Sequence, residues 1–370
     1  VCGEFLSVTT WPVLQALGIA DAYLAKAGPP VRRLGLYETD SAITAAMPRT
    51  DAVNGAGRAL GREHLDSILL EAAIAAGTQA WQPWRAAALE RTGSGWRCMI
   101  DGDRATHPLH ARRVIAATGS WERSPVFDPT TLPHRDGDLL GFKAHFRNAA
   151  LPKDLMPLLV FPGGYGGMVH TDADRVSLSC CIRRDSLRTL RGAQPGRAGD
   201  AVIAHIAGSC GAVGRVLAKA ELQGSVLSAG PIQPGLRRCC DNGIFSIGNC
   251  AGEAHPIVAE GIGMAMQSAW LLCRHLLTAH SGSSLESIGA AYERDWRRHF
   301  VSRIRAASAF AQLALAPSTH GIIRAALRRE PRLLTLGARL SGKTHQLVMD
   351  GASIAAAISS TPFTKATGGH

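Results

Sequence analysis

The sequence predicts an α/β protein in which a parallel sheet is combined with a mainly antiparallel sheet and a helical C-terminal region. Residues 243–248 form a short apolar run, a glycine-rich loop follows, and residues 262–277 repeat apolar side chains at helical spacing. Residues 114–117 form a second continuous apolar run, which is typical of a parallel strand buried on both faces. Four strand-like segments within residues 142–182 indicate antiparallel strands.

The first third of the chain alternates helical and strand-like patterns. Residues 12–24 have the apolar spacing of one short helix, and residues 31–48 alternate as two strands. Residues 60–76 predict another helix, which Gly77 ends. Residues 84–112 then indicate a strand meander.

Residues 292–315 predict a helix with one apolar and one arginine-rich side. Two interpretations stay open for it: a helix that caps the rest of the fold, or a helix that contacts a membrane surface. Residues 359–370 are rich in threonine and glycine, and we expect them to form a disordered tail.

Composition limits the class of protein and its partners. With 370 residues, of which 46% are hydrophobic, the chain can form two or three packed units. Its formal charge of +11 favours an anionic partner such as a nucleotide cofactor, whereas no lysine-rich run or RNA-binding signature points to nucleic acid. The nine cysteines include no C-x-x-C pair, so we expect no metal site and a cytoplasmic protein with reduced thiols. No run of about 18 apolar residues predicts a membrane-spanning helix.

The glycine-rich loop after residue 248 is the centre of the predicted functional site. Gly248 and Gly252 allow a tight turn where a side chain would clash. Gly261 and Gly263 lie at the predicted helix start, where free N–H groups and the positive end of the helix dipole attract an anionic or electron-rich ligand.

This loop resembles the C-terminal flavin motif of FAD-dependent oxidoreductases of the p-hydroxybenzoate hydroxylase and geranylgeranyl reductase superfamily. In that motif an acidic residue holds the ribityl chain and Gly-x-Gly opens a helix that faces the flavin ring. Asn249 stands at the acidic position and can still hydrogen-bond a hydroxyl. The resemblance implies a Rossmann-like FAD-binding domain, an inserted mainly antiparallel β substrate domain and C-terminal helices. It also implies FAD as the cofactor and NAD(P)H as a transient reductant.

The superfamily's N-terminal Gly-x-Gly-x-x-Gly loop does not occur in this sequence. We therefore expect the FAD-binding domain to be N-terminally truncated by roughly 30–40 residues, about one βαβ unit. Under this expectation the FAD-binding domain comprises residues 1–30, 57–126 and 226–280. The substrate domain comprises residues 31–56 and 127–225, and residues 281–358 form the helical region.

The resemblance also implies the site residues. A polar residue at the start of the helix after residue 60 contacts the FAD diphosphate in the family, which assigns this role to Arg62. Cys2, Tyr165 and His255 are candidate catalytic residues, because they match or neighbour positions beside the flavin. The candidate cofactor-binding residues are Arg62, Thr118, Gly119, Gly248, Asn249, Gly252, Pro256, Gly261, Ile262, Gly263 and Met264.

Two glycine-rich segments are not expected to bind nucleotides. Residues 208–214 follow no strand. Residues 337–344 satisfy the spelling of a phosphate-binding loop, but such a loop needs a strand before it and a parallel sheet after it.

The function implied is an NAD(P)H-driven FAD-dependent monooxygenase that hydroxylates an aromatic, polyketide or lipid-like small molecule. Two alternatives stay open: a geranylgeranyl-reductase-like reductase of prenyl double bonds, and an incomplete, non-catalytic fragment. A halogenase is not expected, because the sequence has no Trp-x-Trp-x-Ile-Pro segment.

Overall fold

The computed structural model describes residues 3–49, 55–93, 95–102, 105–119, 135–193, 196–280 and 282–344. Its largest element is a seven-stranded sheet in the order β13-β9-β12-β11-β10-β2-β3. All neighbouring strands are antiparallel except β10 and β2, so the mainly antiparallel sheet predicted from the sequence is confirmed. The strands are β2 (Arg33–Glu38), β3 (Ser41–Ala46), β9 (Leu139–Arg147), β10 (Leu155–Phe161), β11 (Gly164–His170), β12 (Val176–Arg183) and β13 (Glu221–Ile232).

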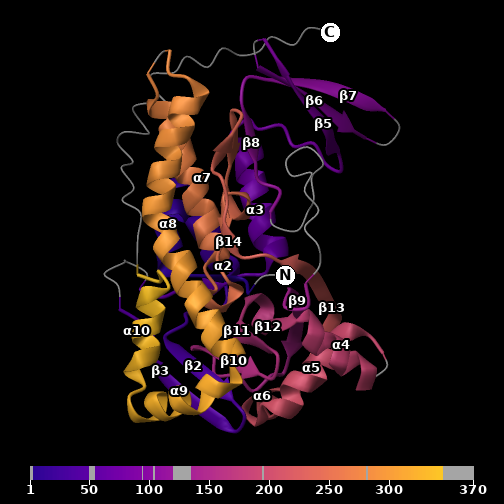
Figure 1. Ribbon diagram of the computed structural model, residues 1–370, viewed down its shortest axis with the longest axis vertical. Helices are drawn as coiled ribbons and strands as arrows, with labels where there is room; N and C mark the ends of the chain where they lie inside the picture. Colours follow the sequence, from indigo (N-terminus) through magenta and orange to yellow (C-terminus); the bar gives the residue numbers. More distant parts are fainter. Residues whose placement is uncertain are drawn as a thin grey trace.

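Helices cover both faces of this sheet. On one face α4 (Arg184–Ala193), α5 (Ala198–Ser209) and α6 (Gly211–Leu217) pack on alternate side chains such as Phe142 and Leu178. The C-terminal helices lie on the other face, where Leu327 packs in one core with Tyr165. Figure 1 shows the strands between the pink helices α4–α6 and the orange and yellow helices α8–α10.

A smaller sheet holds the predicted strand–loop–helix unit. Its strands are β15 (Cys240–Asp241), β16 (Ile244–Ser246) and β8 (Val114–Ala116), and β16 is parallel to β8. Phe245 on β16 is fully buried under α7 (Gly261–Thr278) and α8 (Leu285–Leu315). The prediction that β8 is buried on both faces is wrong, because Ile115 is 42% exposed. Among the described residues β8 pairs only with β16.

The N-terminal part differs from the prediction in one helix. The predicted helix over residues 12–24 is broken into α1 (Trp11–Ala16) and α2 (Ala20–Lys26), because Gly18 adopts φ +70° between them. The next helix is confirmed as α3 (Arg62–Ala75), with Gly77 at φ +94° after its end. The meander is also confirmed, and the short β1 and β4 pair beside α3. These strands are β1 (Phe5–Leu6), β4 (Arg58–Ala59), β5 (Arg85–Thr92), β6 (Gly95–Asp101) and β7 (Thr106–Ala111).

The C-terminal region consists of α8, α9 (Pro317–Arg329) and α10 (Arg332–Leu340). Helix α8 runs along α7 for much of the length of the molecule, and α9 and α10 lie at its lower end against β2 and β3 (Figure 1). The apolar side of α8 is buried, including Phe300 and Ile304, which supports the capping interpretation. The predicted tail over residues 359–370 lies outside the described residues.

The two glycine-rich segments set aside above have no phosphate-loop geometry. Residues 208–214 span the junction of α5 and α6, and residues 337–344 span the end of α10 and the turn after it. Within the described ranges, no single helix is long and apolar enough to cross a membrane. The bent pair Ala198–Ser209 and Gly211–Leu217 meets the criterion by length and composition, with a bend of 116°.

Candidate functional site

The loop between β16 and α7 contains three short elements. It passes through η3 (Gly248–Cys250), β17 (Gly252–Glu253) and η4 (Pro256–Val258) before α7 begins. Strand β17 pairs with β14 (Gly235–Leu236), which fixes the middle of the loop against the preceding chain. The loop thus has its own backbone hydrogen bonds.

The structure explains why glycine occupies two positions in this loop. Gly248 adopts φ +58°, which favours glycine, and its N–H donates to Ser268 Oγ at 2.7 Å. A side chain on Gly252 would overlap the ring of Trp296. In this structure Gly252 therefore serves close packing of the loop against α8.

The start of α7 has the features of a ligand-binding helix terminus. The first N–H groups of a helix have no partner within it, and the side chain of the N-cap residue Glu260 does not bond them. A Cβ atom on Gly261 would meet no atom within 4 Å, whereas one on Gly263 would lie 2.8 Å from Thr10 Oγ1. Thr10 is fully buried, and its hydroxyl has no partner among the described residues. The helix start is therefore open at Gly261, where free N–H groups can receive an electron-rich group.

The Glu260 carboxylate is held by two other parts of the chain. It accepts a hydrogen bond from Ser7 Oγ at 3.0 Å and from Lys343 Nζ at 2.9 Å. Lys343 Nζ also donates to the Val258 carbonyl at 2.6 Å and lies 5.0 Å from the centre of the Phe5 ring. Lys343, which belongs to the segment 337–344 that matches the phosphate-loop pattern, is therefore buried against the glycine-rich loop. No sequence signal points to this contact, because its partners are more than 80 residues apart.

Tyr165 and His255, both candidate catalytic residues, meet across two elements. Tyr165 lies on β11 and His255 precedes η4, and Tyr165 Oη is 3.3 Å from His255 Nδ1. Burial raises the pKa of Tyr165 well above its ordinary value and lowers the pKa of His255. Both shifts favour the neutral form, so the phenol keeps its proton and the imidazole is uncharged near neutral pH.

A cavity of about 360 Å³ lies beside this pair, between the large sheet and the C-terminal helices. Tyr165, Pro256 and Lys343 border it. It follows β10 from Met156 to Val160, a length of roughly 13 Å at the rise of a strand. Its walls are mostly apolar and include Leu34, Leu36, Met156, Leu158, Val160, Phe310, Leu313, Ala314, Ile323, Leu327, Leu333 and Leu334.

The charged groups at the cavity wall are paired within the protein. Glu38, 6% exposed, lies 3.1 Å from His320 Nδ1 and 3.3 Å from Arg324 Nη1. Lys343 is paired with Glu260. A charged ligand would lose its hydration without gaining a free counter-charge, so the cavity favours an uncharged apolar molecule.

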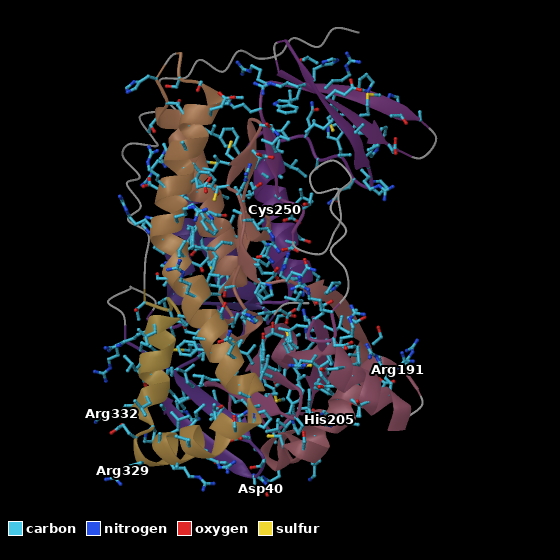
Figure 2. The ribbon with its side chains drawn as sticks, in the orientation of Figure 1. Asp40, Arg191, His205, Cys250, Arg329 and Arg332 are labelled. Atoms are coloured by element: carbon cyan, nitrogen blue, oxygen red, sulfur yellow. The ribbon has the colours of Figure 1, made fainter. Side chains whose placement is uncertain are left out.

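The structure brings two predicted cofactor segments together where β8 ends. Thr118 Oγ1 is 3.3 Å from Cys250 Sγ, and that thiol is 3.4 Å from the Gly119 carbonyl oxygen. Asn249 Nδ2 donates to Glu253 Oε1 at 3.4 Å, and the backbone carbonyl of Asn249 accepts a hydrogen bond from Arg237. Figure 2 labels Cys250 in the middle of the molecule, where these segments meet.

Other predicted site residues have different surroundings. Arg62 forms an exposed ion pair with Asp66 at 2.8 Å on the first turn of α3. Met264 is buried in the core under α8, and Ile262 packs on the core around α1 and α2. The side chains of Ile262 and Met264 therefore serve packing, and the Met264 N–H donates to the Glu260 carbonyl at 2.9 Å. Cys2 lies outside the described residues.

Sequence reasoning missed a buried polar cluster at the junction of β1 and β9. Glu4 is fully buried at φ +60°, is paired with Lys143, and lies 3.0 Å from His145 Nε2. Burial alone would raise the pKa of Glu4, but the hydrogen bond from His145 and the charge of Lys143 hold it below its ordinary value. The available signal was that Lys143 and His145 occupy alternate positions of β9 and so point to the same face. Their partner Glu4 is distant in the sequence and is identified only by the structure.

One cluster has the donor set of a metal site, formed by Glu63, His64 and Asp172. Arg175 lies between its carboxylates, 2.7 Å from Glu63 and in contact with Asp172. The guanidinium thus already neutralises the charge that would hold a cation.

Comparison with models of protein families and with curated proteins finds no match. Solved structures do match. They include the flavin-dependent brominase Bmp2, which is 17% identical with a TM-score of 0.70 and covers 97% of this chain and 89% of its own. A geranylgeranyl bacteriochlorophyll reductase-like protein from Thermoplasma acidophilum is 17% identical with a TM-score of 0.67, over 97% and 86% of the two chains. Klebsiella pneumoniae HpxO, solved with FAD and uric acid, is 15% identical with a TM-score of 0.68, over 92% and 88%.

These likenesses show that the chain has the fold of the brominase, the reductase-like protein and HpxO. The α/β fold predicted from the sequence is thereby confirmed. The ring end of FAD fits the described residues, because the start of α7 is open at Gly261 and the buried Thr10 hydroxyl beside it lacks a partner.

Proposed function

We propose that this chain is an FAD-dependent oxidoreductase, an NAD(P)H-driven monooxygenase that hydroxylates an uncharged, apolar small molecule. One observation carries the proposal: residues 256–259 form both the wall of the apolar cavity and the approach to the open start of α7. A ligand in the cavity and a flavin ring at α7 would be neighbours across this loop.

The chain's residues would bind and orient the cofactor. The N–H groups at Gly261 and Gly263 would hold the pyrimidine edge of the ring. Asn249 would hydrogen-bond the ribityl chain, and the segment Thr118–Gly119 would lie beside that chain. Arg62 would leave its ion pair with Asp66 and bind the diphosphate instead. FAD supplies reduction by NAD(P)H and activation of oxygen when it is bound.

Tyr165 and His255 would organise the reacting edge. Burial raises the pKa of Tyr165, so a proton is held at its Oη, beside the cavity and 3.3 Å from His255 Nδ1. The apolar wall excludes water from the substrate, which strengthens each polar contact made there. Tyr165 would orient a polar group of the substrate through the same hydroxyl.

The elongated cavity also favours a second function, a geranylgeranyl-reductase-like reduction of prenyl double bonds. A cavity roughly 13 Å long with leucine and isoleucine walls suits an extended hydrocarbon chain. The two reactions differ in oxygen: hydroxylation consumes one O₂ per product, whereas reduction of a double bond consumes none.

The test combines a spectrum with an oxygen electrode. Purified protein mixed with FAD should show a bound flavin spectrum after gel filtration, and apolar substrates should stimulate NAD(P)H oxidation. Stoichiometric oxygen uptake supports the hydroxylase, and turnover without oxygen supports the reductase. If the protein retains no FAD under any condition, the result supports the interpretation that the chain is non-catalytic.

A matched pair of variants tests the cavity. Gly337 on α10 borders the cavity with room beside it, so Gly337→Phe should fill the cavity and block substrate-stimulated turnover. Gly321 on α9 is exposed with nothing within 4 Å, so Gly321→Phe should leave turnover unchanged. Equal activity of both variants would place the substrate elsewhere.

A further inference from the structure

Helix α10 presents an apolar stripe to solvent. Leu333, Leu336 and Leu340 are 41%, 49% and 58% exposed. Their spacing of three and four residues places them on one face of the helix. On the other side, Ala338 is buried and borders the cavity. A helix that is apolar toward both the core and the solvent needs a partner for its outer face.

Basic side chains lie near this leucine stripe, at the end of α9 and on α10. The sequence from Leu327 to Leu340 contains four arginines, at positions 328, 329, 332 and 339, and a single carboxylate, Glu330. All four arginines are exposed. Figure 2 shows Arg329 and Arg332 projecting from the same corner of the molecule, where α9 meets α10. The partner is therefore expected to be negatively charged as well as apolar.

The leucine stripe is continuous with the cavity. Leu333 is exposed on the outer face and also borders the cavity, and so does Leu313 of α8, which is 42% exposed. An apolar molecule released from a partner bound at this face would contact the apolar side chains of Leu333 and Leu313 on its way into the cavity.

We propose that the leucine stripe of α10 and its arginine rim dock on an anionic lipid bilayer. Leucines inserted among acyl chains would gain apolar burial, while the arginines would meet lipid phosphates. Helix α8, the candidate from the sequence, is less suited to this role, because Phe300 and Ile304 on its apolar side are buried and Arg303 bonds Gln267 at 3.0 Å inside the core. As a consequence that rests on the proposed function, a lipid-dissolved substrate would enter the cavity past Leu333.

The experiment is co-sedimentation of the full chain with vesicles of phosphatidylcholine, with and without phosphatidylglycerol. The full chain should sediment with the anionic vesicles and more weakly with the neutral ones. Leu336→Ser/Leu340→Ser, which changes two residues outside the cavity wall, should lower vesicle affinity at least about tenfold. The matched control Ile74→Ser/Leu277→Ser, at exposed helical positions elsewhere, should bind as the unchanged chain does.

A second pair separates charge from insertion. Arg332→Gln/Arg339→Gln should lower affinity for anionic vesicles by about fivefold per arginine and leave binding to neutral vesicles unchanged. Circular dichroism melting of each variant verifies that it is folded. Sedimentation needs neither flavin nor turnover, so its failure leaves the proposed function intact, and a colourless protein that binds vesicles leaves this proposal intact.

Three results would overturn the proposal. The first is a folded Leu336→Ser/Leu340→Ser variant that sediments like the unchanged chain. The second is a dimer that this variant converts to a monomer in analytical ultracentrifugation, because the stripe would then bind a second copy. The third is vesicle binding that arises only after removal of residues 345–370, because the stripe would then belong to that segment.

Discussion

Tyr165 and His255 show how burial sets protonation at the candidate site. They lie 90 positions apart, on a strand of the large sheet and in the glycine-rich loop. Burial stabilises the neutral form of both groups, which raises the pKa of the phenol and lowers the pKa of the imidazole. Each shift has consequences for the pH dependence of the protein.

The lowered pKa of His255 predicts a loss of stability in mild acid. Between this lowered pKa and about 6.5, the unfolded chain binds a proton at His255 that the folded chain does not, so stability falls as pH falls. His255→Asn removes this difference. Melting temperatures measured from pH 7.5 to 5 should decline less steeply in the variant, and parallel curves would contradict the assignment.

Two loop glycines predict opposite outcomes for one substitution. Gly252→Val would force a side chain into the ring of Trp296 and should destabilise the fold by about 1–3 kcal/mol in urea titrations. A Cβ atom at Gly261 meets no atom within 4 Å, so Gly261→Val should keep the melting temperature and lose bound flavin instead. A Gly261→Val protein with full flavin content would show that the ring does not lie at the start of α7.

At the scale of elements, buried ion pairs join segments that the sequence keeps apart. The fully buried Glu4 lies next to β1, and its partners Lys143 and His145 project from β9 of the large sheet. Removing one partner of a buried pair leaves a charge without compensation, which costs more than the pair contributes.

Lys143→Met should therefore be strongly destabilising, by about 3–5 kcal/mol in urea unfolding. Lys153 serves as the control, because its ion pair with Asp174 is exposed; Lys153→Met should change stability by less than about 1 kcal/mol. Similar effects of the two substitutions would mean that Glu4 is solvated or protonated in the folded protein. Acidification should also cost stability as pH falls through the lowered pKa of Glu4.

At the scale of the whole molecule, Lys343 connects three distant parts of the chain. It reaches from beyond α10 to Glu260 in the loop, where Ser7 of the N-terminal segment also binds. A double-mutant cycle measures this connection. Lys343→Met and Glu260→Gln should each destabilise the protein, and the double variant should lose less than their sum by about 0.5–3 kcal/mol. Additive losses would show that the pair is not coupled.

The sequence by itself determined the elements that depend on local pattern. Apolar periodicity located the strands around Phe142 and the helix after Gly261, and glycines marked the turns between them. The loop residues of the candidate site were predicted for the same reason: their spacing lies within one short segment. The helix over residues 12–24 was predicted as continuous because Gly18 is tolerated by the apolar pattern and acts only through its φ angle.

Tertiary structure alone decided which of these residues act together. The cavity wall joins β10, η4 and α10, and the pairs of Lys343 with Glu260 and of Lys143 with Glu4 span more than 80 and 130 positions. Such contacts leave no periodicity, because a single charged residue is common on any exposed face. The outward leucines of α10 are a further case: their spacing is that of a buried face, and only the position of α10 against β3 shows that they meet solvent. Burial, and therefore charge pairing and pKa, is a property of the packed chain.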